Sequence, residues 1–147
     1  MRPRNLLLSL LIMVMAPAIC LSYCFEEAGK KYGVSPVVLQ AISKVESNYK
    51  VDAINKNKNE SRDFGHMQIN DRTWKKYLGD GWEYLIYDPC YCTQVGAWIL
   101  RQCMNRYGNT WDAIACYHCG KSPEELPLKT RMRAYEYIRK VQEQIYK

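Results

Sequence analysis

The stretch 36–70 constrains the fold most strongly, because its hydrophobic pattern changes from a helical to an extended period. Ser35 and Pro36 fit the N-cap and the first position of a helix, and apolar side chains then recur on one stripe as far as Glu46. The pattern of residues 51–69, two short apolar runs around a polar loop, predicts a small irregular hairpin or flap. The chain must therefore insert a β element between helices.

Helical signals account for most of the remaining chain. The sequence predicts helices at 24–32, from 71 to a turn at 79–81, at 93–107, from 111 to 115 or beyond, and at 130–145. It shows no internal repeat and no domain linker. At 147 residues the chain is expected to form one α+β domain, mainly α, with a small β flap.

The first 22 residues have the pattern of an export signal. Arg2 and Arg4 form a basic start, residues 6–15 are apolar, and small residues follow at 16–22. The apolar run is shorter than a membrane-spanning helix needs, although a retained anchor stays an alternative. We therefore expect a signal peptide at 1–22, a mature domain at 23–147 and a periplasmic location.

The cysteines agree with export. The chain has seven, and removal of Cys20 with the signal leaves six, which we expect to form three disulfides in an oxidising compartment. Two pairs, Cys90-x-Cys92 and Cys116-x-x-Cys119, have spacings that a zinc site could also use, but bridges are favoured in an exported chain. No metal and no cofactor are expected.

Two carboxylates stand on either side of the change in pattern. Glu46 lies at the edge of an apolar helical stripe near a helix C-terminus, where low polarity and the helix dipole both favour the protonated acid. Asp63 lies 17 positions later, in a polar turn. Two acids from separate elements, one protonated and one charged, are what cleavage of a glycosidic bond requires.

Three motifs, in this order, resemble the lysozyme-like superfamily and in particular the soluble lytic transglycosylase family. They are Glu46-Ser47-Asn48-Tyr49, Ser61-x-Asp63-Phe64-Gly65-x-Met67-Gln68-Ile69-Asn70 and Ala115-Cys116-Tyr117-His118-Cys119-Gly120. With its signal and small size, the chain looks most like the invasion-associated lytic transglycosylases of type III secretion and conjugation systems. The resemblance implies a lysozyme-like fold and cleavage of the bond between N-acetylmuramic acid and N-acetylglucosamine in peptidoglycan, which would let a secretion apparatus cross the wall.

The resemblance also implies roles for individual residues. Glu46 would be the catalytic acid and base, Asp63 a second carboxylate as in lysozymes, and Tyr117 would hydrogen-bond near Glu46. The implied substrate-binding residues are Ser47, Met67, Gln68, Asn70, Trp74 and Tyr117. His118 and Cys119 replace the family's usual Asn-Ala, so the substrate contact made there by asparagine is not carried over.

Two other functions stay open from the sequence. A hydrolytic lysozyme would use Glu46 to activate water, with Asp63 as stabiliser or nucleophile, and a wall-binding assembly factor would keep the fold without the chemistry. The net charge of +6 is modest and not gathered into a dense basic stripe, which argues against nucleic-acid binding. The expected partners are peptidoglycan strands and a secretion-system component, and the mature protein is expected to be a monomer without a stable membrane anchor.

Overall fold

The computed structural model describes residues 22–147. The signal peptide predicted for residues 1–22 lies, except for Ser22, outside this part of the chain. The described elements, in chain order, are α1 (Phe25–Tyr32), α2 (Pro36–Ser47), β1 (Ile54–Lys56), β2 (Arg62–Phe64), β3 (Ile69–Asn70), α3 (Asp71–Leu78), the 3₁₀ helix η1 (Gly79–Ile86), α4 (Pro89–Tyr107), α5 (Trp111–Cys119), the 3₁₀ turn η2 (Pro123–Glu125) and α6 (Leu128–Ile145).

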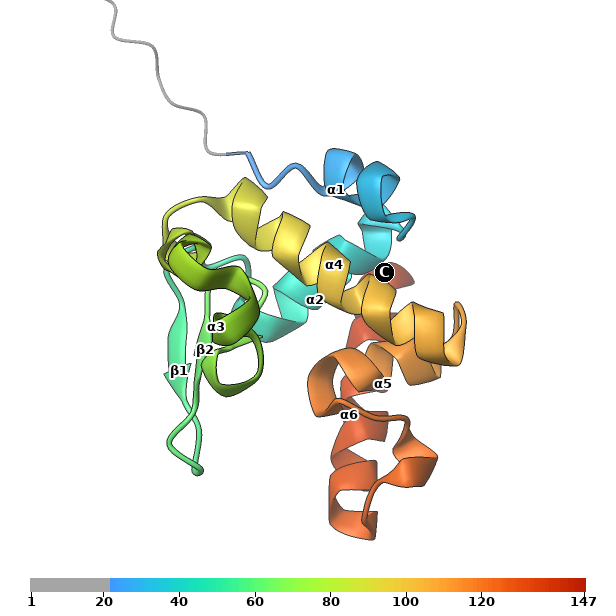
Figure 1. Ribbon diagram of the computed structural model, residues 1–147. Helices are drawn as coiled ribbons and strands as arrows, with labels where there is room; N and C mark the ends of the chain where they lie inside the picture. Colours follow the sequence, from blue (N-terminus) through green and yellow to red (C-terminus); the bar gives the residue numbers. More distant parts are fainter. Residues whose placement is uncertain (1–21) are drawn as a thin grey trace, which may run out of the picture.

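Helix α4 runs through the middle of the molecule (Figure 1). The sheet, α3 and η1 lie to one side of it, and α5 and α6 lie to the other. Helices α1 and α2 pack on each other, α1 also packs on α4, and α2 contacts α6. The fold is therefore mainly helical with a small sheet on one flank, as the sequence predicts.

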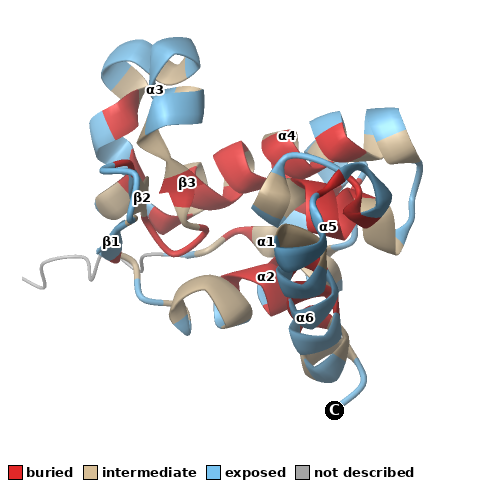
Figure 2. Ribbon diagram, turned by 90° about the horizontal axis from the view of Figure 1, so that it is seen from below, coloured by how far each residue is buried: buried red, intermediate tan, exposed pale blue. Residues whose placement is uncertain are grey.

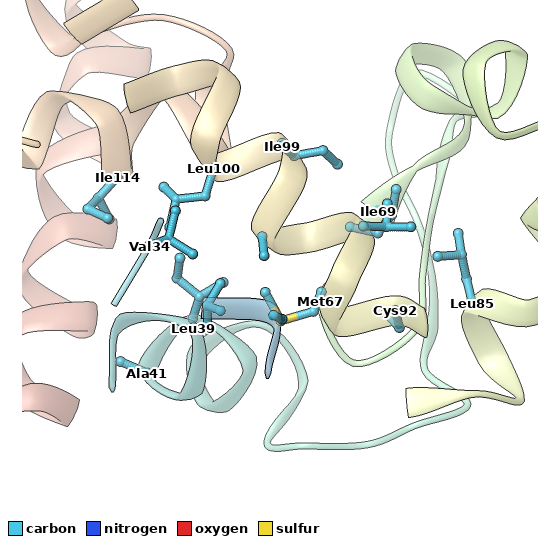
Figure 3. Packing of buried hydrophobic residues seen from close by; sticks show 14 of the residues in the cluster. Val34, Leu39, Ala41, Met67, Ile69, Leu85, Cys92, Ile99, Leu100 and Ile114 are labelled. Atoms are coloured by element: carbon cyan, nitrogen blue, oxygen red, sulfur yellow. The ribbon is translucent and has the colours of Figure 1, made fainter. Parts of the chain in front are cut away.

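The core forms where α2, α4 and the loop before β3 meet. Leu39, Met67 and Leu100 have 0–1% of their surface exposed and lie together in the packing (Figure 3). A Cβ atom on Gly96 would come within 2.6 Å of the Met67 methyl carbon, so only glycine lets Met67 lie this close to α4. Burial is correspondingly concentrated along α4, whereas much of α6 is exposed (Figure 2).

The sheet holds three short antiparallel strands in the order β1-β2-β3. Asp63 on β2 lies opposite Asn55 on β1 and Asn70 on β3. Gly65 follows with φ 72°, and a Cβ atom there would come within 2.3 Å of the Leu85 carbonyl oxygen, so this turn requires glycine. The predicted hairpin is thus the first two strands of a slightly larger sheet.

The largest difference from the sequence-based elements concerns α4. It begins at Pro89 rather than Thr93, because Asp88 caps it by accepting a hydrogen bond from the backbone N–H of Tyr91 at 2.9 Å. What reads as a turn in the sequence is an N-cap followed by a proline at the first helical position. Between residues 22 and 147, no helix is both long and apolar enough to cross a membrane.

The expectation of three disulfides is wrong for the described cysteines. Two bonds form, Cys24–Cys90 and Cys103–Cys116, and Cys92 and Cys119 are free thiols. Cys92 lies in the main core, whereas Cys119 packs against a separate cluster around Ala115, Leu126 and Ala134. Their positions in different clusters leave the two thiols unpaired.

Candidate active site

Glu46 lies in the last turn of α2, with 13% of its side chain exposed. The Tyr137 hydroxyl on α6 donates a hydrogen bond of 2.6 Å to Glu46 Oε1, across 91 positions of sequence. Burial raises the pKa of Tyr137 well above its usual value, and the charge of Glu46 raises it further. Tyr137 is therefore a constant donor that fixes one carboxylate oxygen.

His118, at the end of α5, is the second neighbour of this carboxylate. Its ring stacks on Tyr137 with centroids 4.2 Å apart and planes 7° from parallel. Its Nδ1 atom lies 3.8 Å from Glu46 Oε1, and 41% of its side chain is exposed. His118 thus lies beside Glu46 and is itself partly accessible to solvent, at the position where the sequence departs from the family motif.

Tyr117 lies close to Glu46 but hydrogen-bonds to the backbone of the 65–68 loop. Its hydroxyl donates to the backbone carbonyl of Met67 at 2.8 Å, and the group bonded to Glu46 is Tyr137 instead. Burial raises the pKa of Tyr117 well above its usual value, and the Glu46 charge contributes next. Tyr117 therefore lies within electrostatic range of Glu46, while its hydrogen bond stabilises the 65–68 loop.

That loop brings the Gly-x-Met-Gln motif beside the end of α2. Ser47 Oγ donates to the His66 carbonyl at 3.0 Å. Gln68 has φ 52°, and its side chain donates to the Gly65 carbonyl at 2.8 Å and accepts from Asn55 at 2.6 Å. Met67 has no exposed surface, so it offers none to a sugar in this structure. These residues shape the loop by contacts within the protein.

His66 is the residue in this loop that the sequence reasoning passed over. Its Nδ1 atom is 2.8 Å from Ser43 Oγ and its Nε2 atom is 2.9 Å from the Pro89 carbonyl oxygen. Since a carbonyl only accepts, Nε2 carries the proton and Nδ1 accepts from Ser43. Burial lowers the pKa of His66 to about 4, against the opposing effect of the bond to Pro89. A neutral imidazole thus joins α2, the loop and α4.

Asp63 accepts a hydrogen bond from each side, one from the loop after β1 and one from β3. Its Oδ2 atom accepts from Asn57 Nδ2 at 2.8 Å and its Oδ1 atom accepts from Asn70 Nδ2 at 2.6 Å. The Asn70 side chain is used at its other end as well, because its oxygen caps α3 by accepting from the Thr73 N–H at 3.3 Å. The aspartate is thereby fixed to the flap and to the start of α3.

Trp74, one turn into α3, is partly buried. Its ring packs edge-on against Trp98 of α4, with centroids 5.2 Å apart. The contact ties α3 to α4 and leaves part of Trp74 accessible.

A pocket of about 290 Å³ adjoins Glu46 and extends along α6. The residues of α6 that line it recur three or four positions apart, which places them on one face of the helix. The lining residues are Val45, Glu46, His118, Arg133, Glu136, Tyr137 and Lys140. No sequence motif marks the α6 residues; the only available signal was their helical spacing.

The cysteines also decide the zinc alternative. Cys90 and Cys116, two of the four cysteines considered, are bonded to Cys24 and Cys103. A disulfide sulfur carries no thiolate for a metal. The alternative of a zinc tetrad is therefore excluded for these four cysteines, and the bonds indicate an exported protein, extracellular or periplasmic.

Comparison with known proteins gives a consistent family. The family described as "Transglycosylase SLT domain" matches residues 23–138. "Protein IpgF" of Shigella flexneri is 34% identical over 130 residues, covering 87% of this chain and 84% of the relative. "Invasion protein IagB" of Salmonella typhi is 36% identical over 124 residues, with 82% and 78% covered. "X polypeptide" of Escherichia coli is 32% identical over 126 residues, with 78% and 75% covered. The chain therefore belongs to the transglycosylase SLT domain family and is a peptidoglycan lytic transglycosylase.

Proposed function

We propose that Glu46 is the general acid and general base with which this enzyme cleaves the bond between N-acetylmuramic acid and N-acetylglucosamine. The observation that carries this proposal is the placement of Glu46, a mostly buried carboxyl at the end of α2 that borders a pocket and accepts a hydrogen bond from Tyr137. Since Tyr137 occupies Oε1, proton transfer falls to Oε2. Proton transfer by a positioned group of this kind contributes ~10²–10⁴-fold to rate.

The reaction needs two proton transfers by the same group. Glu46, protonated, first gives its proton to the glycosidic oxygen, and the bond from that oxygen to C1 of the muramic acid breaks. The resulting carboxylate then takes the proton from the 6-hydroxyl of the same muramic acid, whose oxygen forms a new bond to C1. The products are a 1,6-anhydro end and a free 4-hydroxyl, and Glu46 returns to its protonated form.

For Asp63 we propose an electrostatic role: its anion stabilises the positive charge that develops on the sugar ring as the bond breaks. The two asparagine amides that it accepts from fix its place and occupy both oxygens, which favours a stabiliser over a nucleophile. Ser47, Gln68, Asn70 and Tyr117 then support the site through the loop and the flap, and the accessible part of Trp74 provides an aromatic surface for a sugar ring.

We also propose a periplasmic location and a role in opening the wall for a secretion apparatus. The disulfides support export, and the name of the IagB relative, "Invasion protein", supports a link to invasion. A small monomer acting locally would suffice for this task. Of the alternatives, hydrolysis would require Glu46 to activate water in place of the 6-hydroxyl, and a wall-binding factor would have no use for the Tyr137–Glu46 pair.

The test is product analysis with a matched pair of variants. Glu46→Gln keeps the size of the side chain but cannot transfer a proton, so it should leave no measurable cleavage of purified peptidoglycan. Glu27→Gln, at an exposed position on α1, should cleave at the parental rate. Mass spectrometry of the parental products should show 1,6-anhydromuramic acid ends. Parental activity in Glu46→Gln would overturn the assignment, and reducing muramic acid ends would assign hydrolysis.

A further inference from the structure

The pocket beside Glu46 contains a cation that no ion pair explains. On α6, Arg131, Arg139 and Lys140 pair with Glu124, Glu143 and Glu136. Arg133 lies on the same helix and lines the pocket, and no carboxylate among the described residues lies within salt-bridge distance of it. Glu136, the nearest carboxylate along α6, pairs with Lys140 at 2.9 Å. The charge of Arg133 therefore has no carboxylate partner among the described residues.

Arg133 also lies close to the reacting group. Burial raises the pKa of the Cys119 thiol, and the charges of Arg133 and Glu46 act on the same thiol in opposite directions, so both groups lie near it. Arg133 and Tyr137 are four positions apart on α6, one helical turn, and Tyr137 is the residue bonded to Glu46. A ligand group bound to Arg133 would therefore lie beside the sugar whose bond is cleaved.

The chemistry of the substrate supplies a matching group. N-acetylglucosamine is neutral, whereas N-acetylmuramic acid carries a lactyl ether that ends in a carboxylate or continues through an amide into a peptide with carboxylates of its own. A guanidinium presents two parallel N–H donors that match the two oxygens of a carboxylate. Because Arg133 is exposed, such a pair is expected to contribute modestly to binding.

We propose that the pocket formed by Arg133, His118, Tyr137 and Lys140 is a subsite for the carboxylate carried by the lactyl substituent of the muramic acid. The proposal rests on the proposed function, because it assumes that Glu46 acts on this sugar. Arg133 binds the carboxylate, Lys140 with its Glu136 partner borders the far end, and the stacked rings of His118 and Tyr137 form the wall next to Glu46. The subsite distinguishes muramic acid from neutral N-acetylhexosamines by charge.

The experiment compares three strand preparations with the mature enzyme. The first carries peptides, the second is stripped by an amidase and ends in free lactyl carboxylates, and the third is the stripped strand coupled to methylamine, which is neutral at that position. Arg133→Gln removes the charge and keeps hydrogen-bonding capacity. Arg139→Gln, on another face of α6 and outside this pocket, is the matched control.

We expect the parent to cleave at least one carboxylate-bearing strand with a kcat/KM roughly fivefold above the neutral strand, the effect of one partly exposed ion pair. Arg133→Gln should abolish this preference by raising KM for the carboxylate-bearing strand. Added salt should reduce the preference of the parent and leave Arg133→Gln unchanged. Loss confined to stripped strands identifies the lactyl carboxylate, and loss on peptide-bearing strands identifies the peptide.

The proposal is overturned if the parent cleaves neutral and charged strands equally, or if both arginine variants behave alike. Neither result touches the assignment of Glu46, which is tested by its own variant on the same strands. If Glu46→Gln cleaves any of the three like the parent, the proposed function fails instead.

Discussion

At the scale of single residues, the site is organised by what surrounds one carboxyl. Glu46 receives a hydrogen bond from Tyr137, and His118 lies beside both. These neighbours come from α5 and α6, far along the chain from α2. The Glu46 carboxyl is therefore held by the tertiary structure, not by its own helix.

Tyr137→Phe should lower kcat roughly tenfold or more, because a hydrogen bond to a charged group contributes about 1.5–3 kcal/mol. The phenyl ring keeps the stack with His118, so KM and the melting temperature should change little. Tyr135→Phe on the same helix removes a surface bond to Glu124 and serves as the control. Steady-state cleavage of purified strands measures the effect, and a parental kcat in Tyr137→Phe would show that this bond does not position Glu46.

Asp63→Asn should lower activity by roughly tenfold, the effect of about 1.4 kcal/mol on the barrier. The change removes the charge and also one acceptor, so Asn57→Ser is the matched control: it removes the bond to Asp63 Oδ2 and keeps the carboxylate. If Asp63 acts by its charge, only Asp63→Asn is slow. Near-parental turnover by Asp63→Asn would leave a single-glutamate enzyme in which Asp63 only fastens the flap.

The sequence singled out Glu46, Asp63 and the loop residues as candidates because they lie in a short, ordered string of motifs. It could not identify Tyr137 or Arg133, whose positions on α6 become relevant only when that helix packs on α2. It placed Tyr117 near Glu46 without naming a partner, because spacing alone cannot decide which of the two nearby tyrosine hydroxyls bonds to Glu46.

At the scale of elements, His66 connects α2, the 65–68 loop and α4 by hydrogen bonds. Periodicity predicted the helices themselves, since amphipathic stripes and caps are local properties. It missed the start of α4 and the η1 turns, because a proline at a first helical position and a 3₁₀ segment resemble ordinary turns in sequence. The connection through His66 depends on three hydrogen-bonding groups from separate elements, so no local sequence pattern predicts it.

The burial of neutral His66 predicts that the stability of the protein depends on pH. The pKa of His66 is lowered to about 4 in the folded protein, so between about pH 6.5 and 4 the unfolded chain binds a proton that the native protein does not. The contribution of neutral His66 to the free energy of unfolding is complete above pH 6.5. As the pH falls toward 4, this free energy decreases by roughly 3 kcal/mol.

Urea unfolding at several pH values measures that slope. His66→Gln, whose amide can still donate to the Pro89 carbonyl and accept from Ser43, should lose this part of the slope whatever its absolute stability. His118→Gln, at an exposed position, should keep it. A His66 resonance that titrates near pH 6.5 in the folded protein would contradict the prediction.

At the scale of the whole molecule, the six cysteines within residues 22–147 divide into two bonds and two thiols. The sequence predicted their oxidising compartment from an even number, but parity could not show that Cys92 faces the core while its neighbour Cys90 reaches Cys24. Residues two apart on a helix point to different sides. Which cysteines form disulfides therefore depends on how α4 packs and not on the number of cysteines.

Thiol labelling tests this division. In the folded, unreduced mature protein, an alkylating reagent should label Cys119, which is partly exposed. Cys92 should react only on unfolding, because burial raises its pKa to about 12 and keeps the reagent out. The other four cysteines should react only after reduction. Absence of any label before reduction would instead indicate a third bond.

The two bonds should differ in what they contribute to stability. Cys24–Cys90 joins the start of α1 to the start of α4 across 66 positions, whereas Cys103–Cys116 joins α4 to α5 across 13. Because a longer closed loop removes more entropy from the unfolded chain, the bonds should contribute about 4 and about 3 kcal/mol respectively. Double serine variants at each pair, compared by urea unfolding, measure the two values, and a purely reduced sample gives their joint loss. A larger loss from the Cys103/Cys116 pair would mean that contacts in the folded state between α4 and α5, and not loop closure, set the contribution of these bonds.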